Sequence, residues 1–297
     1  MINHMLEQRS LDETYRDASG EQAALLKSFR STHPPGHLDS HGVGWTYFSS
    51  GQGAESLLFL PGALGRAEVA FRHILALEKD YRIIAPNYPP IVKVSQLLEG
   101  IRAILEHLSV ARMSILGSSM GGGIAQCLVQ RQPSVVNKLI LSHTGVPDPL
   151  RARINSFIIE GVRLMPLSLI RAALMKELLH LVSAAPAELN FWRAYFKELL
   201  SALTKEEIVN IYRRAIDLEQ NYSFTAAEAA GWPCEVLILE SDNDSIIKAK
   251  ERAALKKIYP RSRVYTFKGA GHGASIVCRE EFISVVRQFL KEPRHVG

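Results

Sequence analysis

The 297-residue sequence contains only three cysteines, and none lies in a C-x-x-C pair. Cys127, Cys234 and Cys278 are too few and too far apart for a disulfide framework or a cysteine-based metal site. Free cysteines persist in reducing compartments, so we expect a cytoplasmic protein. The first residues, Met-Ile-Asn-His-Met-Leu-Glu, lack the basic start and apolar segment of a signal peptide, which favours the same expectation.

Long apolar runs and concentrated charge are also missing. No stretch approaches the roughly 18 apolar residues of a membrane span, so none is expected. The 35 Lys+Arg are interleaved with 30 Asp+Glu, which leaves a net charge of +5. The densest basic positions, Arg151, Arg153 and Arg163, fall on the polar side of an amphipathic helix. Because nucleic-acid binding needs a contiguous basic patch, no nucleic-acid partner is expected.

What the chain does have is an alternation of short apolar runs with helical patterns. Apolar runs without polar interruption are typical of parallel strands buried on both faces, and helices between them cover those faces. The sequence therefore predicts an α/β fold. The predicted strands are 43–49, 56–60, 81–85, 113–116, 138–141, 236–239 and 263–267, and the predicted helices between and after them are 68–77, 94–108, 122–130 and 280–290.

A helical block interrupts this alternation between residues 147 and 231. Its first helix carries one apolar stripe at helical spacing, made of Ile154, Phe157, Ile158, Val162 and Met165. We therefore divide the chain into an N-terminal arm (1–42), an α/β core (43–146 and 232–297) and a helical cap (147–231).

The pentapeptide Gly117-Ser118-Ser119-Met120-Gly121 fits the G-x-S-x-G pattern of a nucleophile elbow. That pattern requires a strand before it and a helix after it, and the predicted elements 113–116 and 122–130 supply both. The sharp turn exposes the serine hydroxyl, and the helix directs its partial positive charge at the place where negative charge develops on a substrate. Ser119 is the predicted nucleophile.

A serine hydroxyl needs a base to take its proton and an acid to orient that base, in the chain order Ser, acid, His. His272 lies among glycines after the strand 263–267 and is the predicted base; the other nine histidines, His143 included, are read as structural. Glu240, Asp242 and Asp244 follow the strand 236–239. Asp244 is preferred as the acid because it directly precedes the stretch leading back into a helix, with Asp242 as a turn cap.

The oxyanion of the tetrahedral intermediate requires two backbone N–H donors. Met120, the residue after the nucleophile, offers one. The second is expected from Ala63, with Leu64 as the alternative, in the loop Pro61–Gly65 that follows the strand 56–60. This chemistry needs no metal and no cofactor.

These pieces resemble the α/β-hydrolase superfamily over residues 43–290, through the stretches 58–65, 117–121, 237–246 and 269–272. The resemblance implies a mostly parallel eight-stranded sheet with a helical cap, and a catalytic triad of Ser119, Asp244 and His272. Two stretches depart from the common pattern: the oxyanion loop begins Pro61-Gly62 instead of His-Gly, and the stretch after the strand 81–85 reads Pro-Asn-Tyr-Pro-Pro.

Residues 29–32, the Pro-Gly loop and Asn87-Tyr88-Pro89 look like maspardin-type α/β-hydrolase homologues. Some of those proteins lack a complete triad and act as binding partners, whereas this chain keeps the acid and the histidine. We therefore expect a serine hydrolase of carboxylic esters, thioesters or lactones. Hydrolysis of a carbon–carbon bond by the same triad, or a non-catalytic interaction protein, are the alternatives.

The cap is expected to line the substrate pocket. Its apolar and aromatic residues favour a small-molecule substrate with an apolar or aromatic moiety, although each of them also suits helix packing; they include Phe157, Met165, Trp192 and Phe196. A homodimer is also compatible with the sequence.

Overall fold

The computed structural model describes residues 13–18, 20–182 and 185–293. Its centre is an eight-stranded sheet in the order β1-β2-β4-β3-β5-β6-β7-β8, which confirms the predicted fold class. The pairs β1/β2 and β2/β4 are antiparallel, and all other neighbours are parallel. The strands are β1 (Gly36–Ser40), β2 (Val43–Ser50), β3 (Ser56–Leu60), β4 (Arg82–Asn87), β5 (Met113–Ser118), β6 (Val136–Ser142), β7 (Glu235–Ser241) and β8 (Arg263–Phe267).

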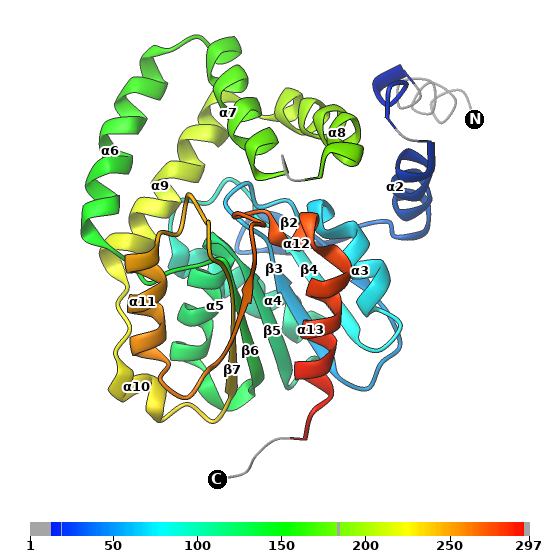
Figure 1. Ribbon diagram of the computed structural model, residues 1–297. Helices are drawn as coiled ribbons and strands as arrows, with labels where there is room; N and C mark the ends of the chain where they lie inside the picture. The colour runs from blue at the N-terminus through cyan, green and yellow to red at the C-terminus, as the bar shows by residue number, and fades with distance from the viewer. Residues whose placement is uncertain (1–12, 19, 183–184, 294–297) are drawn as a thin grey trace.

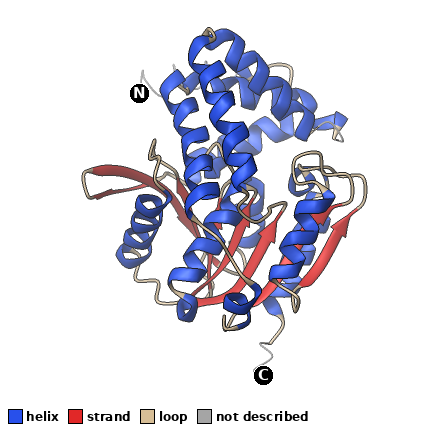
Figure 2. Ribbon diagram, turned by 90° about the vertical axis from the view of Figure 1, so that its left-hand side faces the viewer, coloured by secondary structure: helices blue, strands red, loops and turns tan. Residues whose placement is uncertain are grey.

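Helices cover both faces of the sheet (Figures 1 and 2). The helices around the sheet are α2 (Gly20–Thr32), α3 (Phe71–Leu77), α4 (Val94–His107), α5 (Met120–Arg131), α10 (Ala226–Ala230), α11 (Ala249–Ile258), α12 (Ala274–Val277) and α13 (Arg279–Lys291). The helices α3 and α13 pack on one face, and α4, α5 and α11 pack on the other.

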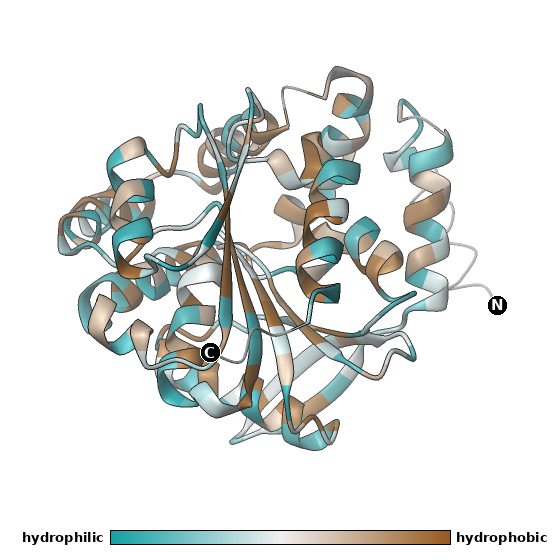
Figure 3. Ribbon diagram, turned by 60° about the horizontal axis from the view of Figure 1, so that its bottom comes forward, coloured by the Kyte–Doolittle hydropathy of each residue, from teal (hydrophilic) through white to brown (hydrophobic). Residues whose placement is uncertain are grey.

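The apolar runs of the central strands explain this arrangement. Leu57 and Leu58 are both fully buried, but they point to opposite faces and join different core clusters. Figure 3 shows the same apolar character along the central strands. Burying one such leucine contributes about 1.5–3 kcal/mol, so strands of this kind are stable only when both faces are covered.

Four longer helices lie beyond the carboxyl ends of the parallel strands, at the top of Figure 1. They are α6 (Pro149–Leu164), α7 (Leu167–Leu181), α8 (Leu189–Ala202) and α9 (Lys205–Asn221). A cluster around Ile159, Val162, Ile170 and Ile208 holds α6, α7 and α9 together. None of the helices in the described ranges is long and apolar enough to cross a bilayer.

Two expectations differ from the structure. The eighth strand, β1, lies inside the segment read as an arm; its alternating sequence Gly-His-Leu-Asp-Ser has no apolar run, and its ladder with β2 makes it a strand. An apolar stripe of the kind identified on α6 usually faces a packing partner, but most of this one does not. Only Val162 of that stripe is buried, whereas Phe157 is 81% exposed and Met165 38% exposed.

Candidate active site

Ser119 occupies the turn between β5 and α5 in a backbone conformation that residues other than glycine rarely adopt. Its φ of 53° and ψ of −121° fall outside the usual regions, which is typical of residues held under strain at functional sites. The Ser119 amide donates to the Ser142 carbonyl at 2.9 Å, so the end of the neighbouring strand β6 holds the turn in place. The predicted strand–serine–helix geometry is present.

Two glycines make this turn sterically possible. A Cβ at Gly117 would lie 2.4 Å from the Gly121 carbonyl oxygen, and a Cβ at Gly121 would lie 2.2 Å from the Leu60 carbonyl oxygen. Neither position has room for a side chain, because backbone atoms cannot move aside as a flexible side chain does. These close approaches explain why the first and last positions of the G-x-S-x-G pattern are glycines here.

The structure brings Ser119, His272 and Asp244 together in one line. His272 Nε2 lies 3.0 Å from Ser119 Oγ, and His272 Nδ1 lies 2.9 Å from Asp244 Oδ2. All three follow parallel strands, β5, β7 and β8, whose carboxyl ends meet at one edge of the sheet. With Nδ1–H donating to the carboxylate, Nε2 is left to accept the serine proton.

The carboxyl of Asp244 is held in its ionised form. Burial favours the neutral acid, but hydrogen bonds from His272 and from the Ile246 and Ile247 amides outweigh it, and the pKa of Asp244 is lowered. The other two acidic candidates serve elsewhere. Asp242 accepts from the Gly269 amide at 2.8 Å and thus ties down the histidine loop, and Glu240 pairs with lysine and arginine side chains of α11.

The segments that carry the predicted oxyanion donors lie beside Ser119. Met120 is the first residue of α5, so its amide has no acceptor within the helix. A Cβ on Gly62 would lie 3.6 Å from Ser119 Cβ, which puts the loop of residues 61–65 beside the serine. Within the described residues neither the Ala63 nor the Leu64 amide donates to an acceptor.

A departure from the common pattern now has a structural explanation. Asn87 Oδ1 accepts from the Ala67 amide at 2.8 Å, and the Tyr88 amide donates to the Gly65 carbonyl at 2.8 Å. Asn87 at the end of β4 and Tyr88 after it therefore fasten the loop that follows β3 to the sheet.

A cavity of about 250 Å³ opens next to Ser119 and His272. Most of its wall is apolar and comes from β3, the loop of residues 61–65 and the turn after it, α7, α8, the loop that carries the acid, and α12. These residues are Phe59, Leu64, Val69, Leu178, Leu181, Phe196, Ile246 and Ile276. Arg66 and His73 are its charged or titratable neighbours. Burial lowers the pKa of His73 to about 4, so the imidazole is neutral near pH 7.

The cavity corrects the predicted lining residues. Phe196 does line it, whereas Phe157 and Met165 are exposed on α6, and the buried Trp192 donates to Glu188 at 3.1 Å instead. The helix α7, which no motif singled out, supplies wall residues that sequence reasoning missed. Only its apolar periodicity could have marked it, and that pattern does not tell which face meets a cavity.

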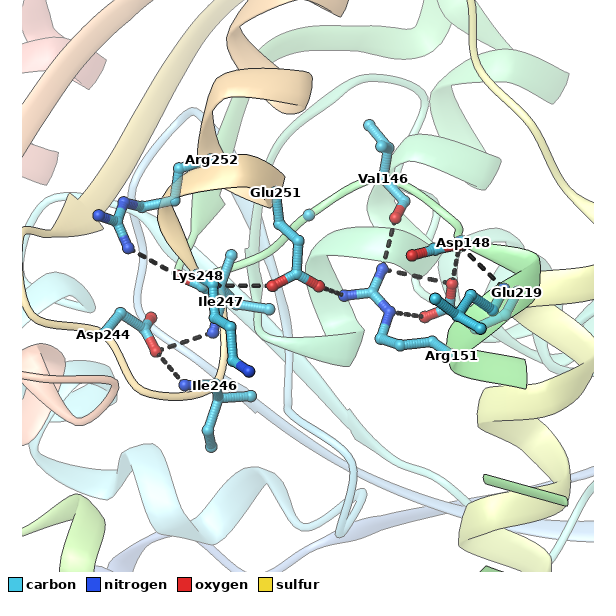
Figure 4. A network of polar contacts seen from close by, with 12 residues as sticks. Val146, Asp148, Arg151, Glu219, Asp244, Ile246, Ile247, Lys248, Glu251 and Arg252 are labelled. Carbon is cyan, nitrogen blue, oxygen red and sulfur yellow. Dashed lines mark hydrogen bonds and ion pairs between the residues drawn. The ribbon is translucent and has the colours of Figure 1, made fainter. Parts of the chain in front are cut away.

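A polar network joins the acid loop to the helices above it (Figure 4). Arg151 of α6 forms ion pairs with Glu251 of α11 and with Glu219 of α9. The Glu251 carboxylate also accepts from the Lys248 amide at 2.7 Å, four residues after Asp244. Because Arg151 is partly exposed, these pairs serve more to fix the position of α6 than to add much stability.

No cluster of three or more metal-ligating side chains occurs among the residues that the structure describes. The site therefore presents a serine, an imidazole, a carboxylate and free amides around an apolar cavity.

Comparison with known proteins agrees with this fold. Residues 55–277 match the family described as alpha/beta hydrolase fold. The chain belongs to this family. This α/β hydrolase is 34% identical to a maspardin from Danio rerio, but over 104 residues only, which is 33% of either chain. The expected resemblance to maspardin-type proteins is confirmed, and the chain matches about a third of their length.

Longer alignments connect this α/β hydrolase to enzymes. It is 27% identical to the 2-hydroxymuconate semialdehyde hydrolase of Pseudomonas putida, over 71% of this chain and 77% of the other. Among solved structures, a hydrolase from Pseudomonas aeruginosa PA01 superposes with a TM-score of 0.74 at 19% identity, covering 87% and 99% of the two chains. An enol-lactonase from Burkholderia xenovorans LB400 gives 0.71 at 17% identity, covering 86% and 100%. At these identities the structures support the fold.

Proposed function

We propose that this α/β hydrolase cleaves a carboxylic ester, thioester or lactone through an acyl-enzyme on Ser119. The observation that carries the proposal is the 3.0 Å contact between Ser119 Oγ and His272 Nε2, with the Asp244 carboxylate 2.9 Å behind the imidazole. Nucleophile, base and orienting acid in hydrogen-bond reach are the arrangement that activates a serine.

In the first half-reaction, Ser119 Oγ attacks the substrate carbonyl carbon while His272 Nε2 takes its proton. The tetrahedral oxyanion accepts hydrogen bonds from the amides of Met120 and of Ala63 or Leu64. As the intermediate collapses, the bond to the leaving oxygen or sulfur breaks, and the imidazolium returns the proton to that atom. The ionised Asp244 stabilises the imidazolium throughout.

In the second half-reaction, water replaces the leaving group. His272 takes a proton from this water, and the resulting hydroxide attacks the acyl carbon. Collapse of the second intermediate breaks the bond to Ser119 Oγ, and the proton on the imidazole returns to the serine. The carboxylic acid leaves and the enzyme is restored.

The cavity limits the size of the acyl group. At about 250 Å³ it is smaller than the ~300–1,000 Å³ typical of sites for drug-sized ligands, and its wall is mostly apolar. We therefore propose a short apolar or aromatic acyl group in preference to a long lipid chain. In this proposal residues 147–231 act as a cap over the core formed by 43–146 and 232–297, with 1–42 as the arm.

A second candidate is hydrolysis of a carbon–carbon bond next to a carbonyl group. Two long alignments with curated relatives favour it, because they are with hydrolases of 2-hydroxymuconate semialdehyde and of a 2-hydroxy-6-oxononadienedioate. The maspardin similarity favours a third, an interaction protein without turnover.

A fluorophosphonate probe separates catalysis from binding, since it labels only an activated serine. We expect labelling of the parent protein and of Ser31→Ala, which changes an exposed serine of α2, and none of Ser119→Ala. Absence of labelling in the parent would favour the interaction protein, and labelling of Ser119→Ala would contradict the proposed nucleophile. Turnover of short p-nitrophenyl esters, thioesters, lactones and dienones by the parent protein without probe then distinguishes the bonds.

A further inference from the structure

The outer face of α6 is an apolar surface without a partner among the described residues. Seven of the ten large hydrophobic side chains that these residues expose lie between 150 and 169. Six of them belong to α6 or its end, with Phe157 81% and Leu164 86% exposed. We call these six the outer stripe: Leu150, Ile154, Phe157, Ile158, Leu164 and Met165.

The outer stripe and the buried face of α6 consist of different residues. The inner face is a second apolar set, Ala152, Ile159 and Val162, which is buried toward α9. A helix that is apolar on both faces is normally covered on both, and contiguous exposed apolar side chains mark interaction sites.

Two leucines of the outer stripe lie symmetrically about Phe157. Leu150 and Leu164 lie seven residues to either side of it, about 10 Å along the axis in each direction. Arg153 and Glu160 lie four and three residues to either side and flank the same edge of the outer stripe. In an antiparallel pair of α6 helices related by a two-fold axis at Phe157, each Arg153 faces Glu160 of the second copy.

The existing contacts leave these charges available. Glu160 pairs with Arg163 at 3.5 Å, but both side chains are more than half exposed, and such pairs contribute little. A membrane surface would favour an edge with basic residues alone, because anionic lipid repels a carboxylate. The opposite charges, which lie within one residue of mirrored positions, fit a second copy of the chain better.

We propose that two copies of this protein associate through antiparallel α6 helices, with Phe157 at the two-fold axis. A 16-residue helix is about 24 Å long, so the contact is smaller than the roughly 800 Å² per partner of a standard interface. The dimer is therefore concentration-dependent.

Sedimentation velocity of the full chain between 1 and 200 µM tests this arrangement. We expect reversible dimerisation of the parent, monomers for Phe157→Glu, and weakened association for Arg153→Glu and for Glu160→Arg. The double exchange Arg153→Glu/Glu160→Arg restores opposite charges and should restore the dimer. A parent that stays monomeric, a dimer that survives Phe157→Glu, or a monomer that binds anionic vesicles through Phe157 overturns the proposal.

A second inference concerns His143, which lies in the core behind the candidate active site. Its side chain is 3% exposed, and its ring lies 5.9 Å from the His272 ring at an angle of 82°. His143 Nδ1 lies 3.0 Å from Ser142 Oγ, and Nε2 lies 2.9 Å from Ser241 Oγ. An edge-to-face ring contact and two buried hydrogen bonds fix this imidazole.

The two serines belong to the segments that hold the nucleophile and the acid. The Ser142 carbonyl accepts from the Ser119 amide, and Ser241 is the last residue of β7, directly before the loop that leads to Asp244. The buried His143 side chain thus contacts Ser142, which holds Ser119, and Ser241, which precedes the loop of Asp244. It also contacts the ring of His272 itself. Burial lowers the pKa of His143 to about 3, so it adds no positive charge beside His272 near neutral pH.

We infer that His143 is a positioning residue that keeps the His272 ring in line with Ser119 and Asp244. The inference rests on the proposed function, since it concerns the same triad. His143 has a φ of 48°, a conformation that glycine and asparagine tolerate better than other residues. Substitution by these two residues therefore removes the imidazole without adding backbone strain.

The test compares His143→Gly, His143→Asn and Ser241→Ala with the parent in fluorophosphonate labelling rate, kcat and KM. For His143→Gly we expect labelling and kcat to fall 10- to 100-fold with KM unchanged, and for His143→Asn a partial recovery. Ser241→Ala, which removes one hydrogen bond, should fall between the parent and His143→Gly. A folded His143→Gly protein that is labelled at the parent rate overturns the inference, whereas a parent that is not labelled at all contradicts the proposed function instead.

Discussion

His73 predicts how the stability of this protein depends on pH. The side chain is 5% exposed, its Nε2 lies 2.7 Å from the Ser275 carbonyl oxygen, and the rings of Phe59 and Phe282 lie beside it. Burial, with a smaller contribution from nearby arginine side chains, lowers its pKa from 6.5 to about 4. The folded protein therefore keeps His73 neutral at pH values where the unfolded chain protonates it.

The sign of the effect follows from proton uptake. Between pH 6.5 and about 4 the unfolded state binds a proton at this position and the folded state does not, so the free energy of unfolding falls as the pH is lowered. Above pH 6.5 the protein keeps its full stability, because His73 is then neutral in the unfolded chain as well. At pH 5, which is 1.5 units below the unfolded pKa, His73 lowers the stability by about 2 kcal/mol at 1.36 kcal/mol per unit.

Urea denaturation at pH 7.5, 6.5, 5.5 and 5.0 measures this loss. His73→Phe loses the hydrogen bond to Ser275 at every pH, which costs about 1–3 kcal/mol, but it removes the titration. Its stability should therefore fall by about 2 kcal/mol less than that of the parent between pH 7.5 and 5. Ile74→Val is the matched control, because it removes a buried methylene from the same helix and leaves the parent's pH dependence. Equal slopes for His73→Phe and the parent would refute the reasoning.

Three further predictions concern the elbow, the acid and the helices above them. Asp244→Asn should lower kcat/KM for a cleaved ester about 10³- to 10⁴-fold without unfolding the protein, because His272 loses its orienting carboxylate; a loss below tenfold speaks against Asp244 as the acid. Arg151→Met should lower the free energy of unfolding, measured in urea, by about 1 kcal/mol and raise KM, since both of its ion pairs to neighbouring helices are lost; an unchanged KM contradicts a link between α6 and the site. Gly121→Ala should cost about 3 kcal/mol or prevent folding, because its Cβ would lie 2.2 Å from the Leu60 carbonyl oxygen; a normal urea midpoint refutes the close approach.

The sequence predicts the central arrangement because local patterns determine it. Apolar runs identify parallel strands, and parallel strands bring their carboxyl ends to one edge of a sheet. Once Ser119, Asp244 and His272 were each assigned to the end of a strand, their meeting followed from topology. The glycines beside Ser119 mark the turn for a steric reason that the structure displays. The catalytic roles of these residues stay predictions.

His143 shows where that reasoning stops. It too follows a strand, but no spacing or flanking residue distinguishes it from a structural histidine. Its contact with His272 depends on β6 lying next to β7, and on a left-handed backbone that turns its ring toward the site. Both are properties of the assembled sheet. The strand β1 escaped prediction for a related reason, because its pairing with β2 defines it and its composition does not.

The helix α6 exposes a different limit of sequence patterns. Helical periodicity identifies apolar side chains and their relative directions, but α6 carries two apolar sets on opposite faces. The packing partner decides between them: α9 presents Ile208 and Val209, and the small inner set with Ala152 allows the two helices to approach closely. The bulkier outer stripe, with Phe157 and Leu164, is left facing outward. A surface that is more apolar than the face already buried has a strong hydrophobic reason to be covered, which is why a second α6 is expected there.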